Sequence, residues 1–148
     1  MSLGSPLKVS STDRISDLSK LLRSMGPRLN DGVYVFLSLP PSTNIGELDP
    51  IATFREDESL SVIVEERRAQ AAGLPILFRA AWITLTVNSD LSAVGLTAAL
   101  SGALADKGIG CNIIAAANHD HLFVPVELAG SGWPRWKSFS PAGCGRFD

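Results

Sequence analysis

Two histidines flank an aspartate in the run Asn118-His119-Asp120-His121, where the sequence carries its most reactive side chains. Alternate residues of an extended strand share one face, so His119 and His121 would form a pair of metal ligands, with Asp120 as a third. A zinc site usually takes three or four protein ligands, and the chain has no other histidine. We therefore interpret the run as a polar turn and predict no metal site. A metal-assisted enzyme stays the weakest alternative.

Cys111 is the second residue whose type could do chemistry. Paired with His119 it would form a thiol–imidazole couple, but nothing in the sequence fixes their geometry and no oxyanion donors accompany them. It lies in an apolar run, where a free cysteine usually packs as a small core residue. We predict no catalytic residue and no cofactor, and so a protein that is not an enzyme.

A binding site is better supported, at the polar turn Asn88-Ser89-Asp90 and the helix predicted to follow it. The first turn of a helix presents free N–H groups and the positive end of its dipole, which accept a carboxylate. Asp90 and Asn112 could hold an ammonium group, and Gly95 leaves room for a ligand one turn into the helix. These residue types favour an amino acid as the ligand. The alternative interpretation is that Asp90 only caps the helix and Gly95 only permits close packing.

Composition and charge narrow the range of partners. The 148 residues carry a net charge of −2 and no block of Lys and Arg, so a nucleic-acid partner is not expected. The two cysteines, Cys111 and Cys144, make neither a disulfide framework nor a paired-cysteine metal motif. Residues 1–5 lack the features of a secretory signal, and no stretch reaches the ~18 apolar residues of a membrane span. We expect a reduced, cytoplasmic protein that does not bind membranes.

Hydrophobic periodicity predicts a mixed set of elements in the first half of the chain. The strand that starts at Gly32 is apolar on both faces, so we expect both faces to be buried or one to meet a partner. The acidic run 56–59 joins two strands into a hairpin, and Gly73 is the left-handed stop of a short helix. In chain order the predicted elements are strand 7–9, helix 13–25, strand 32–39, strand 51–55, strand 60–65 and helix 66–72.

The second half repeats this order more clearly. Its predicted elements are strand 82–87, helix 91–107, strand 111–117 and strand 122–126. The repeat predicts an α+β protein made of two tandem ferredoxin-like βαββαβ units, with antiparallel sheets and helices packed on one face. We place the first unit at residues 1–77 and the second at 78–128. Residues 129–148 form a Gly/Pro-rich tail that opposes the regular second helix of such a unit.

The segment 83–126, ITLTVNSDLSAVGLTAALSGALADKGIGCNIIAAANHDHLFVPV, resembles the C-terminal half of small two-unit ACT-domain proteins. The runs DGVYVFLSL and FREDESLSVIVEE are similar to their N-terminal half, so the resemblance covers roughly residues 13–126. It implies an ACT fold, side-by-side sheet pairing, and an amino acid bound at an interface between units. The positions that it implies for the ligand are Asn88, Ser89, Asp90, Leu91, Val94 and Gly95, with Cys111, Asn112 and Ile113 opposite.

The sequence thus predicts an amino-acid-binding regulatory protein. The main alternative is a structural module for self-association, favoured by the two-sided strand and by Trp133 and Trp136 in the tail. A homodimer is expected in either case, because a symmetric partner can cover unpaired sheet edges.

Overall fold

The computed structural model describes residues 25–86 and 96–130 of the chain. The predicted strand 7–9, nearly all of the predicted helix 13–25, the predicted helix start at 91–95 and the tail beyond residue 130 lie outside this part. The elements described are β1 (Pro27–Leu29), β2 (Tyr34–Leu39), the 3-10 turn η1 (Gly46–Leu48), β3 (Ala52–Arg55), β4 (Leu60–Glu65), α2 (Glu66–Ala71), β5 (Phe78–Leu85), α3 (Leu96–Ala105), β6 (Asn112–Ala115), β7 (Asp120–Pro125) and α4 (Val126–Gly130).

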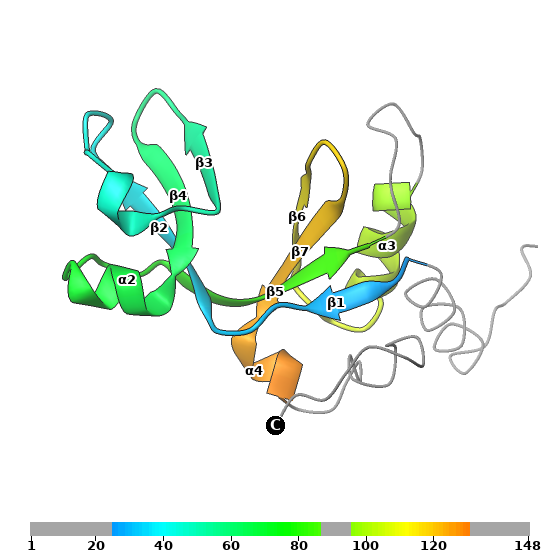
Figure 1. Cartoon of the computed structure of the whole chain (residues 1–148). Helices are drawn as coiled ribbons and strands as arrows, with labels where there is room; N and C mark the ends of the chain where they lie inside the picture. The colour runs from blue at the N-terminus through cyan, green and yellow to red at the C-terminus, as the bar shows by residue number, and fades with distance from the viewer. Residues whose placement is uncertain (1–24, 87–95, 131–148) are drawn as a thin grey trace, which may run out of the picture.

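The strands form one curled antiparallel sheet with the order β3-β4-β2-β5-β7-β6, and β1 pairs with β5 beside β2 (Figure 1). Both predicted hairpins are confirmed, as β3–β4 and β6–β7. The fold class is therefore α+β, as predicted. We use "first half" for the segment from β2 to α2 and "second half" for the segment from β5 to α4.

Strand β5 belongs to both halves. Its first residues, Phe78–Ala80, pair with β2 and so complete the first half as a fourth strand. Its stretch from Ala80 to Leu85 pairs with β7 and is the first strand of the second half. The predicted strand 82–87 begins four residues too late, because residues 78–80 are held by this pairing with β2 and Ala81 by pairing with β7.

The second half also obtains a fourth strand, although its own chain does not supply one among the described residues. Strand β1 takes that place, with Pro27 opposite Leu85 and Leu29 opposite Ile83. Met25, just before β1, is buried in the core under α3. The segment 25–29, which falls within the predicted first unit, therefore packs with the second half.

The Gly/Pro-rich tail is predicted to begin at residue 129, and a short helix overlaps its first two residues. The short helix α4 begins directly after β7 and extends to Gly130. The glycines and prolines that oppose a helix begin only at that residue, so the preceding Val126–Ala129 are free to form a helical turn.

One face of the sheet carries the helices, and the two halves have separate cores on this face (Figure 1). In the first half, Val35, Leu37 and Leu39 pack with Leu48 of η1 and Ala69 of α2. In the second half, the equivalent core forms beneath α3 and contains Ala81, Ile83, Leu85, Leu100, Leu104, Leu122 and Val124. Burial of one face against these elements provides the main stabilisation of the sheet.

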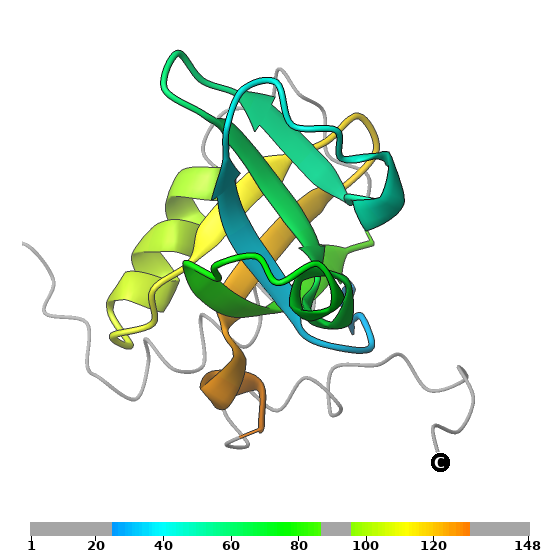
Figure 2. The ribbon, with the colours of Figure 1, turned by 90° about the vertical axis from the view of Figure 1, so that its left-hand side faces the viewer.

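The opposite face is concave, because the strands of the first half cross those of the second half (Figure 2). Aromatic side chains line this face. Tyr34 meets Trp82 with ring centroids 5.0 Å apart, and Phe36 meets Phe123 at 5.4 Å, both edge to face. Strand β2 thus contacts other residues on both faces, as its sequence predicts. None of the helices in the described ranges has the length and apolar character needed to cross a bilayer.

Candidate functional site

The predicted ligand site is only partly described by the structure. Its turn and helix-start residues, Asn88, Ser89, Asp90, Leu91, Val94 and Gly95, lie outside the described residues. Of the three residues predicted opposite them, Asn112 and Ile113 begin β6 and Cys111 directly precedes it.

These three residues have different surroundings. Asn112 is exposed on the edge strand, whereas Ile113 is half-buried and packs against the core under α3. Cys111 packs against the same core, and burial raises the pKa of its thiol to about 11. A thiol with that pKa stays protonated at neutral pH, so Cys111 packs as a core residue and is not an activated nucleophile.

The first half contains the structural counterpart of the predicted turn. Leu39 and Leu85 hold equivalent positions at the ends of β2 and β5, since Leu39 faces Leu60 in β4 and Leu85 faces Asp120 in β7. Thr43 and Asn44 follow Leu39 by four and five residues, as Ser89 and Asp90 follow Leu85. By its distance in the sequence from the strand end, the turn after β2 corresponds to the turn predicted to bind a ligand in the second half.

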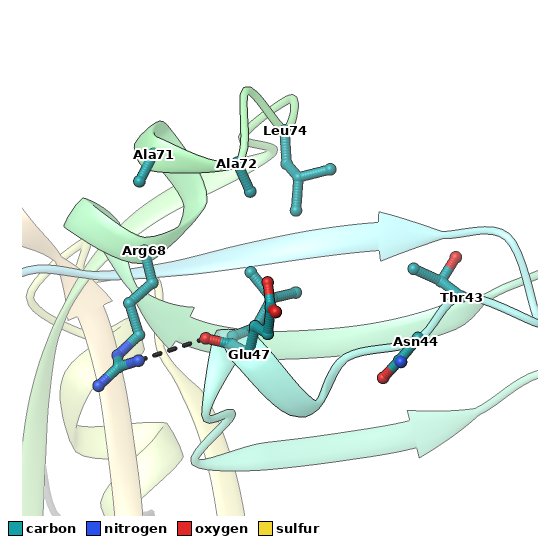
Figure 3. Close-up of a pocket in the computed structure, with 8 residues that line it drawn as sticks. Thr43, Asn44, Glu47, Arg68, Ala71, Ala72 and Leu74 are labelled. Atoms are coloured by element: carbon teal, nitrogen blue, oxygen red, sulfur yellow. Dashed lines mark hydrogen bonds between the residues drawn. The ribbon is translucent and has the colours of Figure 1, made fainter.

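A pocket of about 400 Å³ lies at this turn, between η1 and α2 (Figure 3). We call it the turn pocket. Its volume is within the range of roughly 300–1,000 Å³ that is usual for small-molecule sites. The residues that line it are Thr43, Asn44, Glu47, Leu48, Arg68, Ala71, Ala72 and Leu74.

Local hydrogen bonds shape the turn side of this pocket. The Thr43 hydroxyl donates to the carbonyl of Pro40 at 2.7 Å, and the Asn44 side-chain oxygen accepts from the Gly46 N–H at 3.1 Å. Such side-chain bonds to nearby backbone stabilise turns in place of a regular helix. The connection therefore enters η1, which places Glu47 at the pocket and buries Leu48 in the core.

Helix α2 supplies the other side of the turn pocket. It ends where Gly73 adopts a left-handed φ of 66°, and the Leu74 N–H donates back to the carbonyl of Ala69 at 3.0 Å. This stop turns the chain so that Ala71, Ala72 and Leu74 line the pocket with small and apolar groups (Figure 3).

Arg68 reaches from α2 across the pocket towards η1 (Figure 3). Its Nη1 donates to the backbone carbonyl of Glu47 at 3.3 Å, and its Nη2 lies 3.6 Å from a carboxylate oxygen of Asp49. Both side chains of the ion pair are well exposed, so the pair contributes little to stability. Most of the donor capacity of the guanidinium thus remains available to a carboxylate from outside.

The turn pocket combines the groups that an amino acid requires. A guanidinium can bind the α-carboxylate, the Glu47 carboxylate can bind the α-ammonium, and an apolar wall can contact the side chain. Thr43 and Asn44 add a hydroxyl and an amide at the turn. Neither Glu47 nor Arg68 is among the ligand contacts predicted from the sequence. A comparison of the two halves, residue by residue, would have pointed to the polar turn after β2.

The histidine run adopts a different arrangement from a metal site. The Trp82 indole N–H donates to Nδ1 of His121 at 3.0 Å, and the Thr84 hydroxyl lies 3.2 Å from the same nitrogen. Asp120 is buried in its strand, and His119 lies in the hairpin turn. Within residues 25–86 and 96–130, no three His, Cys, Asp or Glu side chains come together as metal ligands.

Comparison with known families agrees with this fold. Two profiles, each describing an ACT domain, match residues 14–81 and residues 78–130 in tandem. The chain is a two-unit ACT-domain protein. ACT domains are ferredoxin-like, so the predicted family and fold class are both confirmed. Membership of this family implies a regulatory role that often involves amino-acid binding.

Two solved structures resemble this ACT-domain protein. One is a protein of unknown function from Vibrio cholerae, described as a possible transport protein, with 44% identity and a TM-score of 0.69 over 84% of this chain and 94% of that chain. A protein from Agrobacterium tumefaciens has a TM-score of 0.55 over 76% of this chain and 87% of that chain, and its 18% identity shows a shared fold alone. A search of curated proteins gave no match.

Proposed function

We propose that this ACT-domain protein is a regulatory sensor that binds an amino acid in the turn pocket of its first half. The observation that carries the proposal is the placement of Arg68 and Glu47 on one pocket of about 400 Å³, beside an apolar wall and a polar turn. A zwitterion presents one carboxylate and one ammonium, which are complementary to these two side chains. The pocket contains no activated nucleophile, and we propose a binding role and not a catalytic one.

An amino acid that binds in the turn pocket would replace Asp49 as the ion-pair partner of Arg68. The existing contact to Asp49 is long, at 3.6 Å, and the Asp49 side chain is 78% exposed. A ligand carboxylate that bonds bidentately would replace a weak, hydrated pair with a shorter and better oriented one. The ligand therefore displaces a contact of little energetic value.

The second half is proposed to hold a similar site, at a junction between units. Its residues are those of the sequence prediction, Asn88, Ser89, Asp90, Leu91, Val94 and Gly95 with Cys111, Asn112 and Ile113. The equivalence of Asn44 and Asp90 in the two halves supports this second site. A cytoplasmic location and a homodimer remain predictions. Light scattering that returned the monomer mass at working concentration would contradict the dimer.

Calorimetric titration of the full chain with each of the twenty amino acids tests the proposal. We expect at least one to bind, and we expect Arg68→Gln to weaken its affinity by about tenfold or more, as is typical for loss of a charged hydrogen-bonding partner. The matched control is Arg67→Gln, because Arg67 is exposed on the same helix but does not line the turn pocket. Absence of binding by all twenty, or equal affinities for the two variants, would contradict the proposal.

Self-association without a ligand is the second candidate. It is favoured by Phe54 and Leu77, whose side chains are 71% and 69% exposed, and by the edge position of β3 and β6 in the described sheet. Exposed apolar groups beside unpaired strand edges are typical of interaction surfaces. Under this alternative Phe54→Ser would lower the oligomer mass, and no amino acid would raise the melting temperature.

A further inference from the structure

A second cavity lies on the concave face of the sheet, where the two halves approach each other. It is lined by Ile51 and Ala52 at the start of β3, and by Ile114 and Ala116 at the end of β6. These belong to opposite edges of the same curled sheet. We call this space, closed at its base by Trp82, His121 and Phe123, the junction cavity.

The junction cavity is small and its walls are mainly apolar. Its volume of about 170 Å³ equals the space of about six water molecules at ~30 Å³ each. The Trp82 and Phe123 rings lie nearly parallel, 14° apart with centroids at 6.4 Å, and present flat surfaces. Ile51 is 38% exposed at the edge, so apolar surface continues outward to solvent. A cavity of this size and shape can hold a small, flat, apolar ligand group.

One end of the cavity is polar and chemically defined. Nδ1 of His121 accepts the Trp82 indole N–H, so in the neutral ring the proton resides on Nε2. The ring is further fixed by Thr84, whose hydroxyl oxygen accepts from the Asn30 amide at 2.9 Å. Within the described residues the structure gives Nε2 no hydrogen-bond partner. His121 therefore offers one oriented donor to a ligand.

A positive charge, the exposed Arg28, lies two strands away from His121. The pairing register places Arg28 of β1 opposite Thr84, and Thr84 opposite His121, so the three residues form a row across three strands on the concave face. Ile114 continues the row in β6. Burial, the charge of His119 and the charge of Arg28 lower the pKa of His121, while Asp120 raises it, which leaves the ring neutral above its ordinary titration range.

We infer that the junction cavity is a second ligand site, selective for a small planar aromatic carboxylate. The ring would lie between the two edge strands against Trp82, and the carboxylate would accept from Nε2 of His121 and attract the Arg28 guanidinium. The site is distinct from the turn pocket, because it lies on the opposite face of the sheet and shares no lining residue with it. Binding of an amino acid in the turn pocket and of an aromatic acid in the junction cavity can thus be tested independently.

Fluorescence of Trp82 provides the test, with benzoate as the probe. The full-length double variant Trp133→Phe/Trp136→Phe leaves Trp82 as the only tryptophan. In this background we expect saturable quenching by benzoate at pH 7.5, and much weaker responses to acetate, which lacks the ring, and to benzyl alcohol, which lacks the charge. His121→Ser, which introduces the residue found at the equivalent position 61, should weaken benzoate binding by about tenfold or more.

Two further variants keep the inference falsifiable. Ala116→Leu places a larger side chain in the cavity but keeps both Trp82 and His121, and should abolish benzoate binding while the fold is retained. His119→Gln is the matched histidine control and should bind as the parent does. Absence of saturable quenching by benzoate, or binding that survives Ala116→Leu, or binding that is lost in Arg68→Gln would overturn the inference. The last result would place the aromatic acid in the turn pocket instead.

Discussion

The described parts of the first and second halves share most of their elements and differ in one connection between strands. Strands β4 and β7 have the same alternation of buried and half-buried residues, and each leads directly into a short helix. The preceding turns close with the same bond, from the Glu56 N–H to the Ser59 carbonyl at 2.9 Å and from the Ala116 N–H to the His119 carbonyl at 3.0 Å. The backbone of the hairpin is thus conserved between halves although few of its side chains match.

The difference lies in the connection that crosses the sheet. The second half uses the ten-residue helix α3, whose Leu100 and Leu104 cover its core. The first half uses the three-residue turn η1, and only Leu48 of that turn enters the core. A shorter connection leaves space beside α2, and the turn pocket forms there. Of the two equivalent connections, the shorter one is therefore the one that borders the turn pocket.

Loss of core packing should give the largest difference in stability between the two halves. Leu104 in α3 is 1% exposed, so we expect Leu104→Ala to lower the free energy of unfolding by about 3–4 kcal/mol, from lost burial and the cavity left behind. Leu48→Ala should cost less, because the pocket beside η1 gives the neighbours room to adjust. Urea unfolding followed by circular dichroism measures both. Equal losses would show that η1 covers its core as fully as α3 does.

Removal of the Met25 side chain tests whether β1 completes the second half. Met25 is 4% exposed within the core under α3, and Met25→Ala should cost about 2 kcal/mol. Hydrogen exchange should show lowered protection in β7 and α3 and less change in β3 and β4. Uniform loss of protection across both halves would mean that the shared strand β5 transmits the change fully.

Substitution of two glycines by alanine, one in each half, should change the stability in opposite directions. Gly73 stops α2 with a left-handed φ of 66°, and a Cβ there would meet no atom within 4 Å, so Gly73→Ala should cost about 1–2 kcal/mol through backbone strain alone. Gly102 is exposed within α3 and equally open, so Gly102→Ala should stabilise by about 0.5–1 kcal/mol. Thermal unfolding measures both. A stabilising effect of Gly73→Ala would contradict the assigned helix stop.

The smallest expected effect is a pH dependence that only the second half carries. Burial, together with His119 and Arg28, lowers the pKa of His121 in the folded protein, with Asp120 opposing. The unfolded chain therefore binds the proton more readily, so this contribution to stability is complete above about pH 6.5 and is lost as the pH falls through the folded value. His121→Ser should reduce the loss of stability between pH 7.5 and pH 5.5, whereas His119→Gln, which removes a smaller cause of the shift than burial, should reduce it less. Equal slopes for the parent and His121→Ser would exclude this origin.

The sequence predicted the hairpins, the stop at Gly73 and the two-sided character of β2, because these features depend on local periodicity and turn chemistry. It did not predict that β5 begins at Phe78 or that β1 closes the second half, because both depend on pairing between distant segments. The turn pocket was not predicted for the same reason. Nothing in the sequence distinguishes Glu47 and Arg68 from other charged residues, and only the fold brings them to one pocket. The turn at Asn88 remains a prediction, supported by its equivalence to the turn after β2.

Chemical-shift mapping by NMR tests the central claim most directly. The amino acid that binds most tightly in calorimetry is titrated into the isotope-labelled full chain, and the backbone amides are followed. We predict the largest shifts at residues 43–48 and 68–74, the two sides of the turn pocket, and small shifts in β6 and β7. Shifts confined to the second half, or absent from both sides of the turn pocket at saturation, would contradict the claim that the turn pocket beside the shorter connection of the first half is a ligand site.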